Sequence, residues 1–393
     1  MASKDDIYAK MTVAGAVFFA IFEIGYLFTT TPPFDMPGYV IGRDFVATWI
    51  GAKSALALNP AAWFAFDAFN AGLEAMFYQG FPVHNWSYPP HLLLMTWPLG
   101  FLAYMPAYIV WCVGGLALYL WAASDGFTRR DRLPMLAVAP AVAINVFTGQ
   151  IGFITATLIT SALKRLDRRP VVAGVCFGLL TVKPQLGLLV PLMLILTRRW
   201  STFAAATGTV AVMAALAACL FGFDVWAEYF RLVLPVQQDI LVNGGGLAPA
   251  MMPTVFMNAR VAHLPIPVAW ALQAVMSAVA VAAVCWTFWR RRDETLSIAL
   301  FVTASFLVTP YAFNYDMVVF GWVIALLRER GGSALDDRLA MLVWTLPVTT
   351  LIGLAGIPGS SLVLAAFAPR LLWRLSTVGE TAAQPRGLAT AGA

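Results

Sequence analysis

Two aspartates and one lysine stand beside apolar runs and have the side chains needed for proton and anion chemistry. Asp44 follows the first long apolar run, Lys183 interrupts a later one, and Asp316 closes an Asn-Tyr-Asp turn. A carboxylate can take the proton of an attacking hydroxyl group, and an ammonium can bind a phosphate. Because charges at membrane depth are costly, each of the three is a candidate for a functional role.

Other polar side chains occur in the same short segments and complete the candidate site. They are Arg43, Tyr88, His91, Gln150, Gln185 and Asn314. Structural alternatives stay open. Either aspartate could cap the helix that follows it, and Lys183 could snorkel to lipid headgroups. His91 could pack at the interface, and Gln150 could bond a neighbouring backbone group.

The composition is that of a chain solvated mostly by lipid. Of its 393 residues, 60% are hydrophobic and only 11% are charged, whereas soluble domains carry about 25% charged residues. A soluble fold could not cover so much apolar surface with so few charges, so we predict an all-α polytopic membrane protein. The net charge of +5 does not indicate a nucleic-acid partner, because the basic residues form short clusters between apolar runs.

Sequence motifs for metals, nucleotides and disulfides are absent. The four cysteines lie in apolar runs without a CxxC pair: Cys112, Cys176, Cys219 and Cys285. The three histidines lack metal-ligand spacing, and there is no Walker A, GxSxG or DxD motif and no GxGxxG after a strand. We therefore expect no metal and no cofactor, and a lipid-borne substrate fits better than a nucleotide.

Basic clusters orient the apolar runs, because Lys and Arg concentrate in cytoplasmic loops. Five clusters are assigned to the cytoplasm: 129–132, 164–169, 198–199, 290–292 and 328–330. This gives both termini inside and about twelve crossings, at 11–30, 105–122, 134–148, 150–164, 171–182, 185–197, 200–222, 266–289, 295–312, 317–327, 339–355 and 360–374. The cations left on the other side are Arg43, Lys53, Lys183, Arg231 and Arg260.

The charge rule also decides two ambiguous stretches. We place residues 88–103 as a helix on the outer membrane face, because a second crossing there would move 129–132 outside. Residues 170–197 are basic at both ends, so they form a hairpin with Lys183 at its outer tip, where Pro184 ends a helix.

Two long extracytoplasmic loops, 31–104 and 223–265, connect the crossings. The first contains amphipathic stretches at 45–58 and 61–79, predicted as helices that lie on the membrane surface. We expect one transmembrane domain at 1–376 and a disordered cytoplasmic tail at 377–393. The candidate residues all face the extracytoplasmic side of this topology, so we place the site outside the plasma (inner) membrane.

Several short motifs follow one another along most of the chain, from about Asp44 to Leu327. They are Gly42-Arg43-Asp44-Phe45, Tyr88-Pro89-Pro90, Thr148-Gly149-Gln150, Thr181-Val182-Lys183-Pro184-Gln185 and Tyr315-Asp316. In this order the chain resembles glycosyltransferase family 87, within the GT-C class of enzymes that use polyprenyl-phosphate sugars. The resemblance implies a GT-C-like helical bundle, an acidic base at Asp44 and a donor-phosphate region around Lys183. Some mannosyltransferase members carry a histidine near Tyr315-Asp316, whereas this chain has none after His263.

The resemblance further implies an inverting hexosyltransferase, of which mannosyltransferases are one kind, with a lipid or glycan acceptor and membrane lipids as its other partners. In that mechanism Asp316 is the alternative base, and Arg43 assists Lys183 at the phosphate. Hydroxyl groups of the sugar would be bonded by Tyr88, His91, Gln150, Gln185 and Asn314. A transporter or flippase of lipid-linked sugars is the competing hypothesis, with a non-catalytic assembly factor behind it. A transporter, however, is expected to contain inverted repeats and polar residues along a whole path through the membrane.

Overall fold

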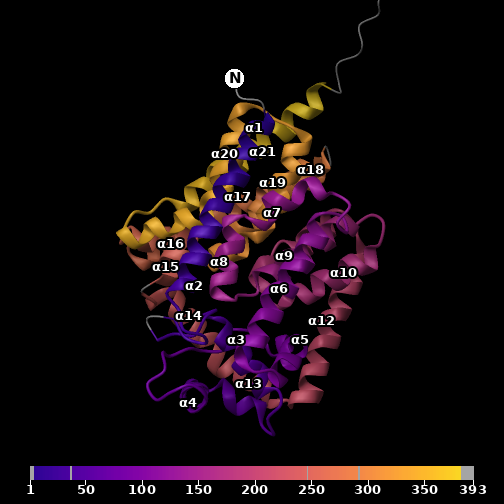
Figure 1. The fold of residues 1–393 in the computed structure, drawn as a ribbon. Coiled ribbons are helices and arrows are strands. Elements are labelled where there is room, and N and C mark those ends of the chain that lie inside the picture. Colours follow the sequence, from indigo (N-terminus) through magenta and orange to yellow (C-terminus); the bar gives the residue numbers. More distant parts are fainter. Residues whose placement is uncertain (1–3, 36–37, 246, 291–292, 382–393) are drawn as a thin grey trace, which may run out of the picture.

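The computed structural model describes residues 4–35, 38–245, 247–290 and 293–381 (Figure 1). Helix makes up 78% of it, and the described residues contain no strand. The prediction of an all-α fold is therefore confirmed.

Six helical stretches in the described part of the chain are long and apolar enough to cross a membrane. The first, Tyr8–Phe28, joins α1 (Lys4–Phe19), the π-turn η1 (Ala20–Ile24) and α2 (Gly25–Phe28). The others are α6 (Tyr104–Ala123), α12 (Trp200–Phe221), α17 (Ile266–Arg290), α20 (Ala334–Thr349) with η10 (Thr350–Ala355), and α21 (Ser360–Thr381). A helix of 20 residues is about 30 Å long, which matches the hydrocarbon thickness of a bilayer.

The other six predicted crossings are shorter helices that form three hairpins. The first hairpin contains α7 (Leu133–Ala137), α8 (Pro140–Thr148) and α9 (Gly152–Arg165). The second contains α10 (Pro170–Leu179), η6 (Leu180–Val182), η7 (Pro184–Gly187) and α11 (Val190–Leu196). The third contains α18 (Glu294–Leu307), η9 (Asn314–Met317) and α19 (Val318–Arg330).

Helix length explains why twelve crossings are not confirmed. The longest helices in these hairpins, α9 and α18, have 14 residues each, which is about 21 Å. That is less than the roughly 30 Å that a crossing requires. The predicted ranges of these six were already shorter than the roughly 20 residues of a full crossing, but the charge rule led us to count them as crossings.

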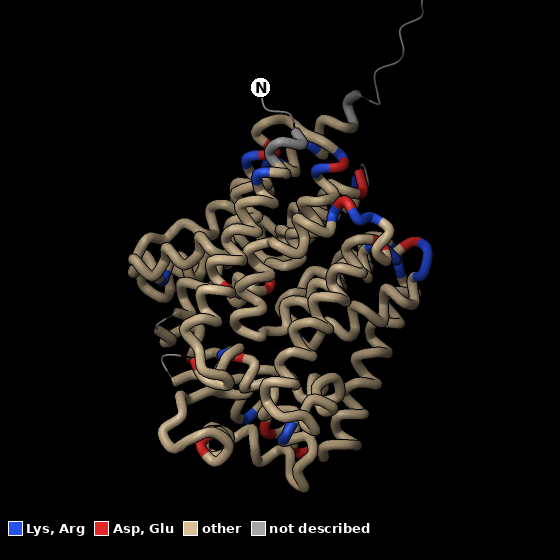
Figure 2. The backbone as a smooth tube through the Cα atoms, in the orientation of Figure 1, with Lys and Arg blue, Asp and Glu red and all other residues tan. Residues whose placement is uncertain are grey.

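The described residues of the five predicted cytoplasmic clusters share one end of the bundle. Ion pairs connect their loops: Arg132 with Glu329, Lys164 with Asp125, Arg199 with Asp167, and Arg330 with Asp293. Much of the charge gathers toward the end that holds the N-terminus and along the adjoining edge (Figure 2). Each short hairpin therefore starts and finishes at this end, and its turn points into the bundle.

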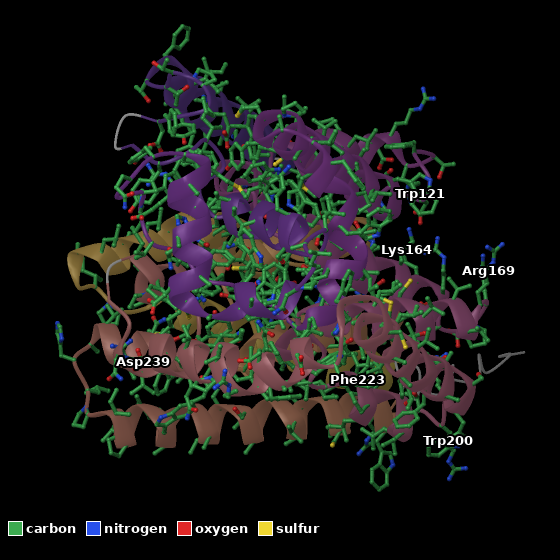
Figure 3. The ribbon with its side chains drawn as sticks, turned by 90° about the horizontal axis from the view of Figure 1, so that it is seen from below. Trp121, Lys164, Arg169, Trp200, Phe223 and Asp239 are labelled. Carbon is green, nitrogen blue, oxygen red and sulfur yellow. The ribbon has the colours of Figure 1, made fainter. Side chains whose placement is uncertain are left out.

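Exposed tryptophans accompany the basic clusters. Trp121 and Trp200 lie along the same edge of the molecule as Lys164 and Arg169 (Figure 3), and both indole rings are exposed. Tryptophan beside arginine and lysine is typical of a membrane–water interface.

The first long predicted loop and the start of the second form one layer at the opposite end, where Figure 1 shows α3, α4, α5 and α13, whereas α15 and α16 of the second loop lie farther up, beside the bundle. The first loop folds into α3 (Phe45–Ser54), η2 (Pro60–Phe64), α4 (Phe66–Met76), η3 (Pro90–Leu92), α5 (Leu93–Thr96) and η4 (Trp97–Phe101). The second folds into α13 (Asp224–Glu228), η8 (Tyr229–Val233), α14 (Leu234–Asn243), α15 (Leu247–Met251) and α16 (Val255–Val261). The segment 88–103 forms short broken turns, none long enough to cross.

Of the two amphipathic stretches predicted as surface helices, 45–58 is wrong. Eight of the ten residues of α3 are buried, among them Phe45 and Trp49, so the stretch 45–58 begins with a core helix. Apolar residues occur on every face of this helix, and a helix of that kind must be buried by its neighbours, here the other loop helices. By contrast, α4 buries only Phe69 and Leu73, as a helix at a surface does.

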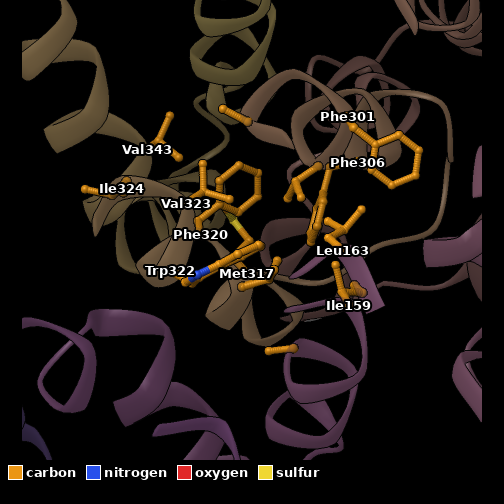
Figure 4. Close-up of a cluster of buried hydrophobic side chains, with 14 of the residues drawn as sticks. Ile159, Leu163, Phe301, Phe306, Met317, Phe320, Trp322, Val323, Ile324 and Val343 are labelled. Atoms are coloured by element: carbon orange, nitrogen blue, oxygen red, sulfur yellow. The ribbon is translucent and has the colours of Figure 1, made fainter. Parts of the chain in front are cut away.

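The core is centred on the third hairpin. Phe320, Trp322 and Val323 of α19 pack with Phe301 and Phe306 of α18, with α9 and α20 on either side (Figure 4). Eleven of the 14 residues of α18 are buried, so protein rather than lipid surrounds this hairpin.

The second hairpin is held by small residues. Gly174 and Gly178 lie four apart on one face of α10, and a Cβ at Gly174 would lie 2.4 Å from the Thr202 carbonyl oxygen on α12. Glycines at this spacing let two helix backbones approach closely, which fixes the chain that leads to Lys183.

At the C-terminus α21 continues to Thr381, five residues into the predicted tail. The rest of that tail, 382–393, lies outside the described residues.

Candidate functional site

Three aromatic side chains on one face of α6 hold the two backbone segments on which the site is built. Tyr104, Tyr108 and Trp111 follow at spacings of four and three, which places them on a common helix face. Each donates a hydrogen bond to a backbone carbonyl: Tyr104 to Ile41 (2.7 Å), Tyr108 to Val146 (2.6 Å) and Trp111 to Gly149 (3.0 Å). Residues 41–44 and the turn at 149–150, distant in sequence, thus meet at one place.

The Asp44 carboxylate is positioned by a chain of side-chain hydrogen bonds. Gln150 Nε2 donates to Asp44 Oδ2 at 3.0 Å, and the Tyr88 hydroxyl donates to Gln150 Oε1 at 2.6 Å. Asp44 precedes α3 but makes no side-chain capping bond. The contacts therefore do not support the capping alternative for Asp44, and they leave its Oδ1 free of protein partners among the described residues.

Lys183 and Asp316 form a buried ion pair at the turns of the second and third hairpins. Lys183 Nζ donates to Asp316 Oδ1 at 2.6 Å, and the two side chains are 4% and 0% exposed. The ammonium lies 4.5 Å from the centre of the Tyr315 ring, which attracts a cation. Lys183 does not reach outward, so snorkelling does not describe it.

The other oxygen of Asp316 has a structural task. Phe313 N–H donates to Asp316 Oδ2 at 3.0 Å, so Asp316 stabilises the turn that begins α19, as the capping alternative proposed. Both oxygens of this carboxylate are engaged, whereas Asp44 has one that is not.

Electrostatic coupling joins these two groups into one site. Burial raises the pKa of the Tyr88 hydroxyl well above its ordinary value, and the negative charges of Asp316 and Asp44 raise it further. Tyr88 therefore stays a protonated hydrogen-bond donor. The charge of Asp44 also acts on the Lys183 ammonium, so the three predicted ionisable groups share one local field.

Close packing of a glycine brings the first and third hairpins together. A Cβ at Gly152, at the start of α9, would lie 2.2 Å from the Tyr315 carbonyl oxygen. Real Cβ atoms do not approach a carbonyl so closely, so only glycine fits here.

We expect Gly152→Ala to destabilise the protein by about 1–3 kcal/mol, the usual cost of forcing extra atoms into a packed core. Because the added methyl group would push the Asn314–Met317 turn away from Lys183, the substitution should also lower activity. Gly114→Ala on α6, where a Cβ meets nothing within 4 Å, is the matched control and should be neutral or slightly stabilising. Thermal unfolding in detergent measures both, and equal melting temperatures would contradict this packing.

His91 lies on the side of the site next to α12 and α13. Its Nε2 is 3.2 Å from Thr181 Oγ1, and its ring stacks on Trp226 with centroids 5.9 Å apart. Burial lowers the pKa of His91 to about 4, so the ring is neutral at physiological pH and acts as a hydrogen-bonding group.

An apolar pocket of about 160 Å³ opens beside Thr181. It lies between the second hairpin and α12, with Phe177, Pro184, Val190 and Phe203 among the residues that line it. Thr181 lines this pocket and also contacts His91, and it precedes Lys183 by two residues in the sequence.

No hydrogen bond or ion pair between described residues connects three of the predicted site residues to this cluster. Arg43 pairs with Asp35 at 2.8 Å, and the Asn314 amide donates to the Pro347 carbonyl at 2.8 Å, toward α20. For Gln185, which is half-buried, the described residues offer no hydrogen-bond partner. The sequence could propose these residues from their local segments, but the neighbours of a side chain depend on tertiary packing.

Sequence reasoning missed several neighbours of the site. Asp35 neutralises Arg43, Trp226 covers His91, and Phe313 stacks on Tyr315 at 4.9 Å. The aromatic run 311–315 next to Asp316 was a usable signal for a ring beneath a cation. Nothing in the sequence singles out Trp226 or Asp35. No group of three or more His, Cys, Asp or Glu is arranged to hold a metal within the described ranges.

Comparison with known proteins connects this geometry to a family. The model for glycosyltransferase family 87 matches residues 86–310, more than half of the 393 residues. No curated protein and no solved structure matches the chain. The matched range contains Tyr88, Gln150 and Lys183, while Asp44 and Asp316 lie outside it and are hydrogen-bonded to Gln150 and Lys183.

Proposed function

Because the chain belongs to glycosyltransferase family 87, we propose that it transfers a hexose from a polyprenyl-phosphate carrier to a lipid or glycan acceptor. The observation that carries the proposal is the convergence of one available carboxylate, Asp44, and one buried cation, Lys183, in a single electrostatic site. A base and a phosphate-binding cation are what this transfer needs.

The chemistry is a single displacement. The acceptor hydroxyl attacks the anomeric carbon, the carbon–oxygen bond to the phosphate breaks, and its electron pair leaves with the phosphate oxygen. The hydroxyl proton passes to Asp44. The negative charge of Asp44 is thereby replaced by one on the departing polyprenyl phosphate, and the anomeric configuration inverts. This leaving group is a stable anion, so no second carboxylate is required to protonate it, unlike in a glycosidase.

The surroundings of Asp44 suit a base. Gln150 holds one oxygen, so the carboxylate keeps a fixed direction while Oδ1 is available for the proton. Asp316 is less suited, because Lys183 and the Phe313 N–H occupy its two oxygens. We therefore assign the base to Asp44 alone.

Lys183 supplies the positive charge for the donor phosphate. An ammonium has three N–H donors, and Asp316 takes one of them, so two can bond phosphate oxygens. The apolar pocket beside Thr181 is suited to bind the start of the hydrocarbon chain that continues from this phosphate. Tyr88, His91 and Thr181 offer hydrogen bonds to sugar hydroxyls between these points.

We further propose that the site faces the extracytoplasmic side of the plasma membrane. In a cysteine-free background, Ala75→Cys on the exposed face of α4 should react with an impermeant maleimide added from outside. Thr128→Cys, exposed among the basic clusters, should react only after the membrane is opened, because such clusters stay in the cytoplasm. Outside labelling of Thr128→Cys would overturn the orientation.

An assay in detergent micelles separates a transferase from a flippase of lipid-linked sugars. Purified protein is mixed with radiolabelled polyprenyl-phosphate hexose and a membrane glycolipid extract. A transferase moves label into a new glycolipid and releases polyprenyl phosphate. A flippase leaves the donor chemically unchanged, since micelles have no two sides, and that result would contradict the proposed function.

A further inference from the structure

The ion pair between Lys183 and Asp316 poses a problem for a phosphate site. The cation that is to bind the donor already has a partner at 2.6 Å, and both side chains are buried. Removing two charges from water costs several kcal/mol per ion, which the attraction between them only partly offsets. If Asp316 served only to keep Lys183 ionised, it would no longer be needed once the donor phosphate is bound.

Asp316 cannot leave when the donor binds. Its Oδ2 is fixed by the Phe313 N–H at 3.0 Å and it stands in the turn that begins α19. Lys183 is equally fixed at its backbone, because Lys183 N–H donates to the Leu180 carbonyl and the Lys183 carbonyl accepts from Leu186. A phosphate bound by Lys183 must therefore share the ammonium with Asp316 and feel its negative charge.

The charge of the phosphate changes during the proposed reaction, on which this inference rests. The donor is a phosphodiester with one negative charge. The product is a monoester with about 1.5 to 2 negative charges at neutral pH. Coulomb repulsion grows in proportion to charge, so a fixed carboxylate disfavours the product more than the donor.

We propose that Asp316 is a product-release residue: it shares Lys183 with the donor phosphodiester and displaces the more highly charged polyprenyl phosphate after transfer. Asp316 makes no contact with the reacting atoms and takes no proton. It acts through Lys183, by competing for the ammonium and by repelling the extra charge that transfer leaves on the phosphate.

The variant Asp316→Asn tests the proposal, because the amide keeps the size and can still accept from Phe313 N–H while losing the charge. Polyprenyl phosphate should inhibit the variant on the order of tenfold more strongly, the change that corresponds to one charge-assisted interaction. Donor affinity should change less. The single-turnover rate should be kept while steady-state kcat falls, because release becomes slow.

Asp336→Asn is the matched control. It removes an equal charge from another ion pair, that with Arg370 at 2.7 Å in the first turn of α20, and should leave product inhibition unchanged. If Asp316→Asn folds and its product inhibition equals that of the wild type, the release role is wrong. A single-turnover rate that falls about a hundredfold or more would instead make Asp316 a base and also overturn the proposal.

A second measurement needs no variant. Wild-type protein should bind short-chain polyprenyl phosphate and its monomethyl ester with affinities within a fewfold of each other, because the second charge gains from Lys183 and loses to Asp316. A monoester bound more than about tenfold tighter than its ester would overturn the release role. If the wild type binds neither lipid, the proposed function falls and the role of Asp316 falls with it.

Discussion

Asp44→Asn protein should fold, insert and bind the lipid-linked donor, while its rate of sugar transfer falls by about 10²–10⁴-fold. The acceptor hydroxyl is a poor nucleophile until a base begins to take its proton, and the amide cannot do so. The substitution keeps the shape of the side chain and an oxygen for the hydrogen bond from Gln150 Nε2. The loss should therefore appear in kcat and in the single-turnover rate, with little change in donor affinity.

Asp67→Asn is the control for this experiment. Asp67 is an exposed carboxylate on α4 in the same layer of loop helices, and its neutralisation should leave transfer unchanged. A correctly inserted Asp44→Asn protein that turns over at a near-normal rate would remove Asp44 from the mechanism. Since Asp44 makes no capping bond, stability should change little in either case.

Lys183→Met should lower both stability and transfer, and a second substitution should separate the two effects. Methionine keeps the apolar stem but leaves the fully buried Asp316 carboxylate without its cation. Breaking a buried pair from one side typically costs about 3–5 kcal/mol. Loss of the charge that faces the phosphate should reduce transfer by about 10²–10³-fold, the usual effect of removing one stabilising donor.

The double variant Lys183→Met with Asp316→Asn contains no uncompensated charge, so its melting temperature should return toward that of the wild type. Transfer should stay low, because no cation faces the phosphate. Recovery of transfer together with stability would show that Lys183 serves the fold alone. Thermal unfolding and the micelle assay on the same preparations give both readouts.

Local chemistry in the sequence singled out several segments that the structure brings together. Asp44, Tyr88, Gln150, Lys183 and Asp316 each stand beside an apolar run, where a polar group is costly without a role. In the structure they are joined by hydrogen bonds, an ion pair and a shared field. The basic clusters likewise predicted which loops share an end of the bundle, because charge bias is a property of whole loops.

Helix burial and pairing could not be predicted from the sequence. Hydropathy cannot distinguish a helix buried in protein, such as α18, from one that faces lipid, so the short hairpins were counted as crossings. Similarly, the stretch 45–58 was interpreted as an amphipathic surface helix, but its first part, α3, is buried in the protein. The pairing of Lys183 with Asp316 joins residues 133 apart, and no local pattern specifies such a contact.

The central claim is that the sugar comes from a lipid phosphate and that Asp44 activates the acceptor. The most direct measurement supplies purified wild-type and Asp44→Asn proteins, in lipid vesicles with a glycolipid acceptor extract, with either a labelled polyprenyl-phosphate hexose or the matching nucleotide sugar. We predict labelled glycolipid from the wild type with the lipid donor only, and at least about 10²-fold less from Asp44→Asn. Label incorporated from the nucleotide sugar, or equal incorporation by the two proteins from the lipid donor, would contradict the account.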